Sequence, residues 1–515
     1  MNRAEKSVLI VYSLLWTLGA TFGFGIVRPD STAINYVLII LLYIIPITAI
    51  CYGLLSTPSK LGLLVATPLL PSLLVLDPVE LGLYGHDPYI HTLPALSQFQ
   101  HGAISQMLSE LSFPGMYAFY SAMEAVLGLG PNPLAKYIPL LSLTAIPIIY
   151  LAFRRVYADR VAFVAATLFS SVRLIYLFEI KFIDEFLAVP LFAVVLLVLF
   201  TLGDRRQRYL LLLFLLVLVL THHVFSLLLL LILGFWLFIP LLLQKQPLRR
   251  LQPTSKPPKL FLPTSLASLL LCWLLIWGGS QTTSGLVVYL VKGLIMGDTL
   301  AVKGGVSSPV LTQLKLISRM SILAIAGLCL LVAYRVLNRR SQSDWVLGWS
   351  AAAGVIGGVY AVTLFAGRLI PLDPGRLLIH WFFLLIGVAT PVLWLKKPKR
   401  HYVVILASIF IVATQLAAIP PVVMYSDIDT TTTGEGHYTP AQFEASAWAG
   451  QYTDGPIIAY ESGLWVSNGI EFISYTNNEF ADCQLKSWRK ESGDPRPMNE
   501  SIVFDSNDIA LQTCR

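Results

Sequence analysis

Four groups of ionisable residues interrupt an otherwise apolar sequence, and each group lies at the end of an apolar run. Charged side chains near the apolar slab of a membrane are costly, so their presence there points to function. Carboxylates and imidazoles move protons or orient hydroxyls, and guanidiniums bind phosphate through two parallel hydrogen bonds. This combination favours a pocket for a phosphate-bearing substrate whose lipid tail stays in the membrane. The groups are Asp77, Glu80, His86, Asp87 and His91; Glu179, Lys181, Asp184 and Glu185; His222 and His223; and Arg368, Asp373 and Arg376.

The composition indicates that these groups belong to a membrane protein. The chain has 515 residues, of which 56% are hydrophobic and 13% are charged, and its mean hydropathy is +0.71. A soluble domain carries about 25% charged residues, and a disordered chain has the opposite balance, so both classes are excluded. The net charge of +7 does not indicate a nucleic-acid partner, because most basic residues lie in short loops where membrane orientation explains them.

Apolar runs long enough to cross a bilayer, which takes about 20 residues, predict about thirteen transmembrane helices. The run 209–243 is long enough for two spans, and its polar break at Thr221, His222 and His223 places the turn there. The segment 112–131 is predicted to be an interfacial or re-entrant helix, because counting it as a span would reverse the distribution of basic residues. The predicted spans are 7–27, 34–55, 61–76, 134–153, 161–178, 186–202, 209–222, 224–243, 263–280, 319–334, 345–366, 377–395 and 402–420.

The distribution of charge also predicts the orientation. With a cytoplasmic N-terminus, the cytoplasmic loops hold most of the basic residues and few acids, as the positive-inside rule requires. An odd number of spans then places the C-terminal tail outside, and all four ionisable groups face that side. We therefore predict a multi-pass protein of the cell membrane, with two transmembrane helices in 1–60, a helical region with the active site in 61–420, and a first external loop at 77–133.

The tail 421–515 is predicted to be a small extracytoplasmic α/β domain. Thr439 and Pro440 form a helix-start pattern with Gln442 in the capping-box position, and GPIIAY at 455–460 is typical of a strand after a turn. Cys483 and Cys514 are both external by this topology, where a disulfide can persist; two reduced, buried thiols are the alternative. Tryptophans near the ends of spans, Trp349 among them, are predicted to lie at the membrane interface.

Four short motifs resemble those of GT-C glycosyltransferases, multi-span enzymes that use polyprenyl-phosphate sugar donors. The layout over 61–420 is similar to that of the dolichyl-phosphate-mannose protein mannosyltransferases. One difference is that Asp87 is followed by Pro88, so the adjacent acidic pair usual in the first loop is absent; another is the two additional spans before residue 61. The motifs are Gly85-His86-Asp87-Pro88-Tyr89-Ile90-His91, Phe178 to Ala188, Thr221-His222-His223 and Asp373-Pro374-Gly375-Arg376.

The resemblance implies inverting sugar transfer on the extracytoplasmic face, from a polyprenyl-phosphate-linked donor to a lipid-linked glycan, a surface polysaccharide or a protein. Asp87 would be the general base, and Arg376, with Arg368 or Lys181, would hold the phosphate. Further substrate contacts are expected from His91, Glu179, Asp184, Glu185, His222 and His223. No cofactor is predicted; the external carboxylates would accommodate a divalent metal, although no ligand spacing specifies one.

Simpler structural roles compete with each of these assignments. Asp87 and Pro88 also fit a helix start, the turn from Glu179 to Glu185 could be a solvated loop, His222 and His223 could be a polar corner, and the arginines could extend to lipid headgroups. Other functions also remain open: a polysaccharide polymerase or ligase with a lipid-diphosphate donor, a lipid or glycan transporter, and a receptor or assembly scaffold. Few acids lie at span centres, which disfavours a transporter.

Overall fold

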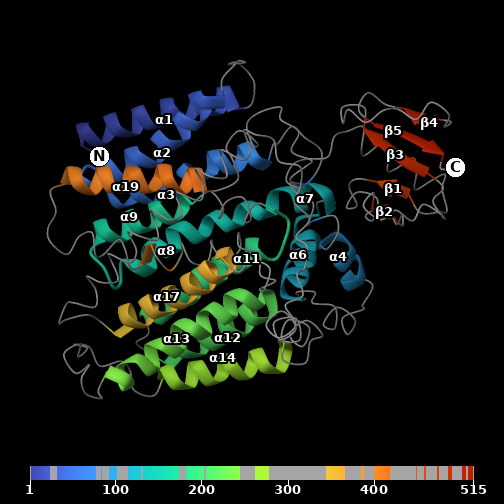
Figure 1. Ribbon diagram of the computed structural model, residues 1–515. Coiled ribbons are helices and arrows are strands. Elements are labelled where there is room, and N and C mark those ends of the chain that lie inside the picture. Colours follow the sequence, from blue (N-terminus) through green and yellow to red (C-terminus); the bar gives the residue numbers. More distant parts are fainter. Residues whose placement is uncertain are drawn as a thin grey trace.

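The structure is a computed structural model whose main helices lie before residue 418 and whose strands lie from residue 457 onward (Figure 1). It describes residues 2–23, 32–76, 83, 88, 92–100, 114–128, 131–172, 181–201, 205–243, 261–277, 344–365, 384, 386–387, 400–417, 448, 457–459, 472–474, 485–489, 502–505 and 509–513.

The helices pack side by side in a bundle, and sequence neighbours are often spatial neighbours, as for α1 with α2 and α8 with α9. Helix α19 is the last helix of the helical region, and it nevertheless packs on α2, one of the first (Figure 1). The helices are α1 (Arg3–Gly23), α2 (Thr32–Cys51), α3 (Thr57–Leu76), α4 (Leu93–Gln100), α6 (Pro114–Leu127), α7 (Pro131–Tyr137), the 3-10 helix η2 (Ile138–Thr144), α8 (Ala145–Phe153), α9 (Asp159–Ser170), α11 (Glu185–Thr201), α12 (Arg205–Thr221), α13 (His223–Leu243), α14 (Phe261–Trp277), α17 (Asp344–Phe365) and α19 (Arg400–Ala417).

Helices overlap the predicted spans wherever those spans lie within the described residues. Among the described residues, three helical segments are long and apolar enough to cross a membrane: α1, α3 and the continuous stretch Leu134–Phe153, which runs from α7 through η2 to the end of α8. The predicted span 319–334 and most of 377–395 lie outside the described residues. The apolar helical architecture is therefore confirmed, whereas the number of thirteen spans and their orientation stay predictions.

Large apolar side chains fill the interior of the bundle and also cover parts of its outer surface. The main core joins α2, α8, α9, α11, α12 and α13 around fully buried rings such as Tyr43, Phe163 and Phe192. Outward-facing apolar residues are the pattern expected of helices in contact with lipid. They include Ile10 and Leu14 on α1, Leu213 on α12, Leu271 on α14 and Ile409 on α19, which are between 54% and 61% exposed.

A second, smaller core lies at the end of the bundle where α4, α6 and α7 gather (Figure 1). It contains Tyr117 and Tyr120 of α6, Leu134 of α7, and Phe182 and Phe186 at the start of α11. Tyr120 and Phe182 pack with their ring centroids 4.9 Å apart. The short α6, which carries this core on one face, lies within the segment 112–131, whose interfacial or re-entrant position stays a prediction.

A closed polar network marks the other end of the Leu134–Phe153 segment. Asp159, the first residue of α9, accepts hydrogen bonds from Lys60 of α3 and from the Tyr150 hydroxyl at 2.6 Å, and pairs with Arg154 at 3.2 Å. The helical stretch of 20 residues, about 30 Å long at 1.5 Å per residue, begins in the smaller core at Leu134 and ends beside this network. Phe182 and Asp159 thus lie near opposite ends of the bundle.

Trp349 is buried inside the bundle, so the prediction that its side chain faces the membrane interface is wrong. Its side chain is 1% exposed, donates its indole N–H to the carbonyl of Leu384 at 2.7 Å, and packs edge-on against Phe153. A buried backbone acceptor and an aromatic neighbour satisfy both the polar and the apolar part of the indole in the interior.

The tail contains a five-stranded mixed sheet in the order β2-β1-β3-β5-β4. The strands are β1 (Ile457–Ala459), β2 (Phe472–Ser474), β3 (Leu485–Arg489), β4 (Ile502–Asp505) and β5 (Ile509–Thr513). Strand β1 runs parallel to β2 and β3, whereas β5 is antiparallel to β3 and β4. Strand β1 falls within the predicted strand at 455–460. The helix predicted from Thr439, and Cys483 and Cys514, lie outside the described residues, so the α/β domain and the disulfide stay predictions.

Candidate functional site

Five of the predicted site residues lie in the described part of the chain, and they all come from two short segments. Lys181, Asp184 and Glu185 lie at the start of α11, and His222 and His223 lie at the junction of α12 and α13. The other predicted site residues lie outside the described residues: Asp87, His91, Glu179, Arg368 and Arg376.

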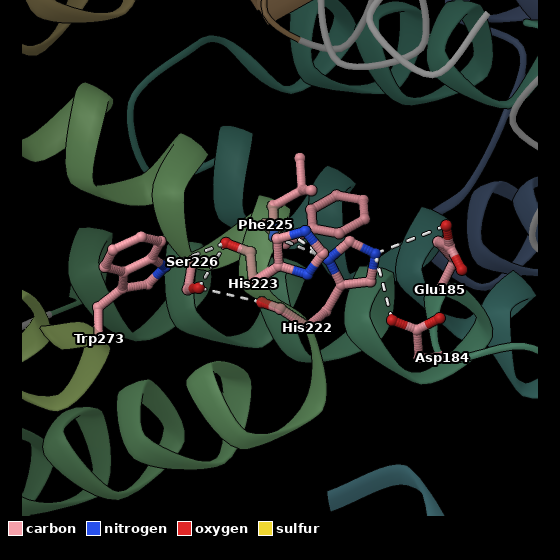
Figure 2. A network of polar contacts seen from close by, with 8 residues as sticks. Asp184, Glu185, His222, His223, Phe225, Ser226 and Trp273 are labelled. Atoms are coloured by element: carbon pink, nitrogen blue, oxygen red, sulfur yellow. Dashed lines mark hydrogen bonds and ion pairs between the residues drawn. The ribbon is translucent and has the colours of Figure 1, made fainter. Parts of the chain in front are cut away.

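Asp184, Glu185 and His222 converge, although 37 positions separate Glu185 from His222 along the chain. The Nε2 atom of His222 lies 3.4 Å from Oδ2 of Asp184 and 3.6 Å from Oε1 of Glu185. The side chain of His222 is 3% exposed, that of Asp184 13% and that of Glu185 10%. Figure 2 shows both carboxylates directed at the same edge of the imidazole. Two acids and one imidazole therefore share a nearly dry site.

The backbone of α13 fixes the chemical form of His222. This residue precedes the first residue of the helix, and its Nδ1 accepts the backbone N–H groups of Val224 at 3.0 Å and Phe225 at 3.3 Å. The imidazole is thus a helix N-cap, satisfying donors that have no partner inside the helix. An accepting Nδ1 carries no proton, so in the neutral ring Nε2 carries it. His222 consequently presents an N–H donor to the two carboxylates.

The sequence around α11 explains why its two acids lie at this point. Backbone N–H groups of Leu187 and Ala188 donate to the carbonyl of Asp184, which therefore opens the helix. Acidic side chains are stabilised at a helix start because the unpaired N–H groups give that end a partial positive charge. Phe182 and Phe186, on either side of the acids, anchor this turn in the smaller core. Burial of the rings thus holds Asp184 and Glu185 at the end of the bundle.

His223 and Lys181 adjoin the acid cluster in different ways. The His223 ring stacks on that of His222 with centroids 5.4 Å apart and planes inclined by 8° (Figure 2). The carbonyl of His223 accepts the Ser226 hydroxyl at 2.8 Å and the Trp273 indole N–H at 3.4 Å. Lys181 is 2% exposed in the same turn as the acids, so a cation accompanies them in the interior.

Helix α6 supplies two residues that the sequence did not single out. Burial raises the pKa of the Tyr117 hydroxyl, and the nearby charge of Asp184 raises that pKa further. A Cβ atom placed on Gly115 would lie 2.8 Å from Oγ1 of Thr221, the residue before His222. Tyr117 therefore borders the acid cluster. Because Gly115 has no side chain, α6 can pack closely against Thr221, the residue before His222. Only the three-residue spacing of Tyr117 and Tyr120, which places both on one helix face, could have indicated this.

The carboxylates of this site fit a divalent cation better than the imidazole does. The ligand atoms of Asp184, Glu185 and His222 lie within 4.8 Å of one another, and oxygen-bound cations have metal–ligand distances of about 2.0–2.6 Å. The capping hydrogen bonds leave His222 with a protonated Nε2, which has no lone pair for a metal. The donor set therefore fits an oxygen-ligated cation held by Asp184 and Glu185, with Nε2 of His222 lying 3.4 Å and 3.6 Å from their oxygens.

Comparison with known proteins gives limited likenesses. No family model matches the chain, and no curated protein matches it. Among solved structures it is similar to an oligosaccharyltransferase of Archaeoglobus fulgidus tethered to an acceptor peptide that contains the NVT sequon, with a TM-score of 0.47, 14% identity, and coverage of 81% of this chain and 64% of that one.

Two further structures of the Archaeoglobus protein are similar to this chain. The apo form has a TM-score of 0.46, 15% identity, and coverage of 81% and 65%. The complex with an inhibitory peptide and a dolichol-phosphate has a TM-score of 0.42, 15% identity, and coverage of 79% and 63%. This chain thus spans less than two thirds of the length of those proteins. The scores are low, and nothing about the activity of this chain follows from them.

Proposed function

We propose that this protein is an integral-membrane glycosyltransferase of the GT-C type. It transfers a sugar from a polyprenyl-phosphate donor to a lipid-linked glycan, a surface polysaccharide or a protein on the extracytoplasmic face. The observation that carries this proposal is the buried convergence of Asp184, Glu185 and His222 at one end of the apolar helices. A lipid-anchored donor would present its phosphate at that level, with its tail among the exposed apolar helix faces.

Burial makes the acid cluster suited to chemistry on a charged substrate. Charges interact more strongly away from water, and a preorganised set of polar groups stabilises developing charge without reorganising. Asp184 and Glu185 would bind hydroxyls of the sugar or orient the acceptor, with the N–H of His222 holding the two carboxylates in place. Lys181, buried in the same turn, would attract the donor phosphate.

In the proposed reaction, the acceptor oxygen attacks the anomeric carbon while the bond from that carbon to the phosphate oxygen breaks. The hydroxyl proton passes to the carboxylate of Asp87, the general base, and the lipid phosphate leaves with the bonding electrons. Arg376, with Arg368 or Lys181, holds the leaving phosphate, and His91, Glu179 and His223 complete the substrate pocket. Attack opposite the leaving group inverts the configuration of the sugar.

A divalent cation, if bound, would be held by the carboxylates of Asp184 and Glu185, and would supply positive charge next to the donor phosphate. The residues of the chain would then position the cation through the same contacts that order the acids: the N-cap of His222 and the aromatic anchors Phe182 and Phe186.

The proposal is tested by sugar transfer with the purified full chain in lipid, given radiolabelled polyprenyl-monophosphate sugars and a crude pool of lipid-linked glycans. The variants are Asp87→Asn, Asp184→Asn and Glu185→Gln, compared with the wild type. We expect each to lose about 100-fold or more in transfer rate, within the range of general-base and electrostatic contributions. Glu124→Gln is a matched control, because Glu124 is an α6 acid whose contact is with Gln100, and it should transfer as the wild type does.

Each alternative outcome changes a particular part of the proposal. Wild-type transfer from diphosphate-linked donors alone would make the monophosphate assignment wrong. Transport of labelled lipid across vesicles without any transfer would contradict the enzyme assignment altogether. Unchanged transfer by Asp184→Asn and Glu185→Gln, with equal thermal stability, would leave the acid cluster a structural feature.

A further inference from the structure

Two arginines from distant parts of the chain pack on consecutive residues just after the end of α2, at the end of the bundle opposite the acid cluster. A Cβ atom placed on Gly53 would lie 3.1 Å from Nη2 of Arg160, so this guanidinium of α9 packs on the Gly53 backbone. The guanidinium carbon of Arg400, the first residue of α19, lies 5.9 Å from the centroid of the adjacent Tyr52 ring. Both guanidiniums are within electrostatic range of the Cys51 thiol. Arg160 therefore lies on Gly53 and Arg400 on the neighbouring Tyr52, with both charges near Cys51.

The turn that follows α2 is shaped for this close approach. Gly53 has a φ of +72°, a backbone conformation that favours glycine. The N–H of Gly53 donates to the carbonyl of Ile50 at 3.0 Å, and that of Leu54 to the carbonyl of Ala49 at 2.9 Å, which closes the helix end. A larger residue at position 53 would be strained and would displace Arg160.

Among the described residues, the positive charge here exceeds the negative charge nearby. The end of α2 contributes roughly half a negative charge, against two full positive charges. The nearby acid, Asp159, is already bound by Lys60, Tyr150 and Arg154. Within the described ranges no carboxylate forms an ion pair with Arg160 or Arg400, and both side chains are exposed. The two guanidiniums thus retain a net positive charge at the surface.

An apolar surface adjoins this positive site. Tyr52 is 48% exposed beside Arg400, and α19 continues from Arg400 with Tyr402, Ile405 and Ile409 exposed by 54%, 51% and 59%. A free anion would use only the guanidiniums, whereas a lipid with an anionic headgroup would use both surfaces. The arrangement matches a headgroup at the membrane surface with acyl chains along a helix.

We propose that Arg160 and Arg400 bind the phosphate of an anionic phospholipid, whose acyl chains lie on the exposed face of α19. By the predicted topology this is the cytoplasmic leaflet, on the opposite side from the proposed sugar transfer. The proposal does not depend on that function. A phospholipid and inorganic phosphate offer the same phosphate group to the arginines. The exposed apolar face of α19 favours the lipid.

The test measures phospholipid retention by the full chain, using native mass spectrometry and thermal shift in detergent. The probes are phosphatidylglycerol, phosphatidylcholine with the same acyl chains, and inorganic phosphate. We expect the wild type to retain phosphatidylglycerol in preference to phosphatidylcholine. Arg160→Gln with Arg400→Gln should weaken phosphatidylglycerol binding about tenfold or more, because two charge-assisted contacts are removed. The variant Arg160→Lys with Arg400→Lys should bind phosphatidylglycerol more weakly than the wild type and more tightly than the glutamine variant, since lysine keeps the charge but lacks the planar guanidinium.

The matched control removes the same charge elsewhere. Lys6→Gln with Arg206→Gln alters two exposed cations and should change binding less than twofold. Equal losses of phosphatidylglycerol binding in the control and in the arginine variant would indicate a general attraction between basic residues and the lipid, and would overturn the proposed site. Unchanged binding in the arginine variant, with an unchanged elution volume, would also overturn it. If inorganic phosphate alone stabilises the wild type and displaces the lipid, the lipid assignment is wrong. Should the glutamine variant fail to fold, the lysine variant decides, and binding equal to the wild type would contradict arginine-specific recognition.

Discussion

The two ends of the bundle each hold an acid at the start of a helix, and the comparison between them separates a stabilising network from a candidate active site. At α9, one carboxylate, Asp159, receives Lys60, Tyr150 and Arg154, so donors outnumber acceptors. At α11, two carboxylates, Asp184 and Glu185, approach the single Nε2 of His222. The first arrangement surrounds one acid with three donors; the second brings two acids together beside one imidazole and the buried Lys181.

This difference indicates which property of the protein each cluster controls. A carboxylate that accepts several charge-assisted hydrogen bonds contributes mainly to folding, because its charge is already matched. Two carboxylates brought together in a nearly dry site are costly to fold, and such groups gather where a substrate or cation is bound. The Asp159 network should therefore control stability, and the Asp184–Glu185 cluster should control activity.

The largest expected effect is on activity, from the double variant Asp184→Asn with Glu185→Gln. We expect sugar transfer to fall by about 100-fold or more, while the melting temperature stays within a few degrees of the wild type or rises, because a costly pair of charges is removed. Transfer assays and thermal unfolding in the same detergent measure both quantities. A large fall in melting temperature with little change in transfer would reverse the comparison.

The next effect is on stability, from Asp159→Asn. We expect a loss of about 2 kcal/mol, since hydrogen bonds to a charged group contribute roughly 1.5–3 kcal/mol, and Lys60, at 9% side-chain exposure, would lose its partner. Transfer by the folded fraction should be unchanged. Chemical denaturation gives the free energy of unfolding, and Glu124→Gln is the control. Loss of transfer at full stability would contradict a purely structural role for Asp159.

A smaller effect should separate the two roles of His222. His222→Ala removes the helix cap and should lower the free energy of unfolding by about 1 kcal/mol. His222→Asn supplies another capping side chain and should leave that free energy unchanged. Both variants remove the N–H that faces the acids, so both should lower transfer, by about tenfold. If His222→Asn transfers sugar as the wild type does, capping is the whole function of His222, and its contact with Asp184 and Glu185 has no catalytic consequence.

The smallest expected effect is the pH dependence of the Asp159 network. Burial by itself raises the pKa of Asp159, but the hydrogen bonds from Lys60 and Tyr150 and the charges of Lys60 and Arg154 together hold that pKa below its ordinary value of 3.8. A lowered folded-state pKa stabilises the protein above the unfolded value, and this stability is lost as the pH falls through the folded-state pKa.

The stability difference between the wild type and Asp159→Asn should therefore be constant near neutral pH and shrink below about pH 4. Thermal unfolding of both proteins across this range measures the difference. A difference that persists unchanged well below the ordinary pKa would show that packing, not the charge of Asp159, stabilises this end of the bundle.

Hydropathy predicted most of the helical elements, and turn chemistry predicted the corner at Thr221 to His223, where α12 ends and α13 begins. The first strand of the tail was also predicted from its composition. Within the candidate site, the sequence identified Lys181, Asp184, Glu185, His222 and His223. It did not identify Tyr117 or Gly115 of α6, because an aromatic residue and a glycine in an apolar helix show no chemistry until a neighbour is known.

The sequence by itself therefore determined that the chain forms apolar helices with ionisable residues at their ends, since burial of apolar groups and the cost of burying charge act locally on each segment. Only the tertiary structure decided which ionisable groups meet. Three sets of contacts join segments far apart in the sequence: His222 with Asp184 and Glu185, Lys60 with Asp159, and Arg160 and Arg400 with the two residues that follow α2. Such contacts depend on how helices pack against one another, and side-chain packing is a property of pairs of surfaces that no single segment encodes.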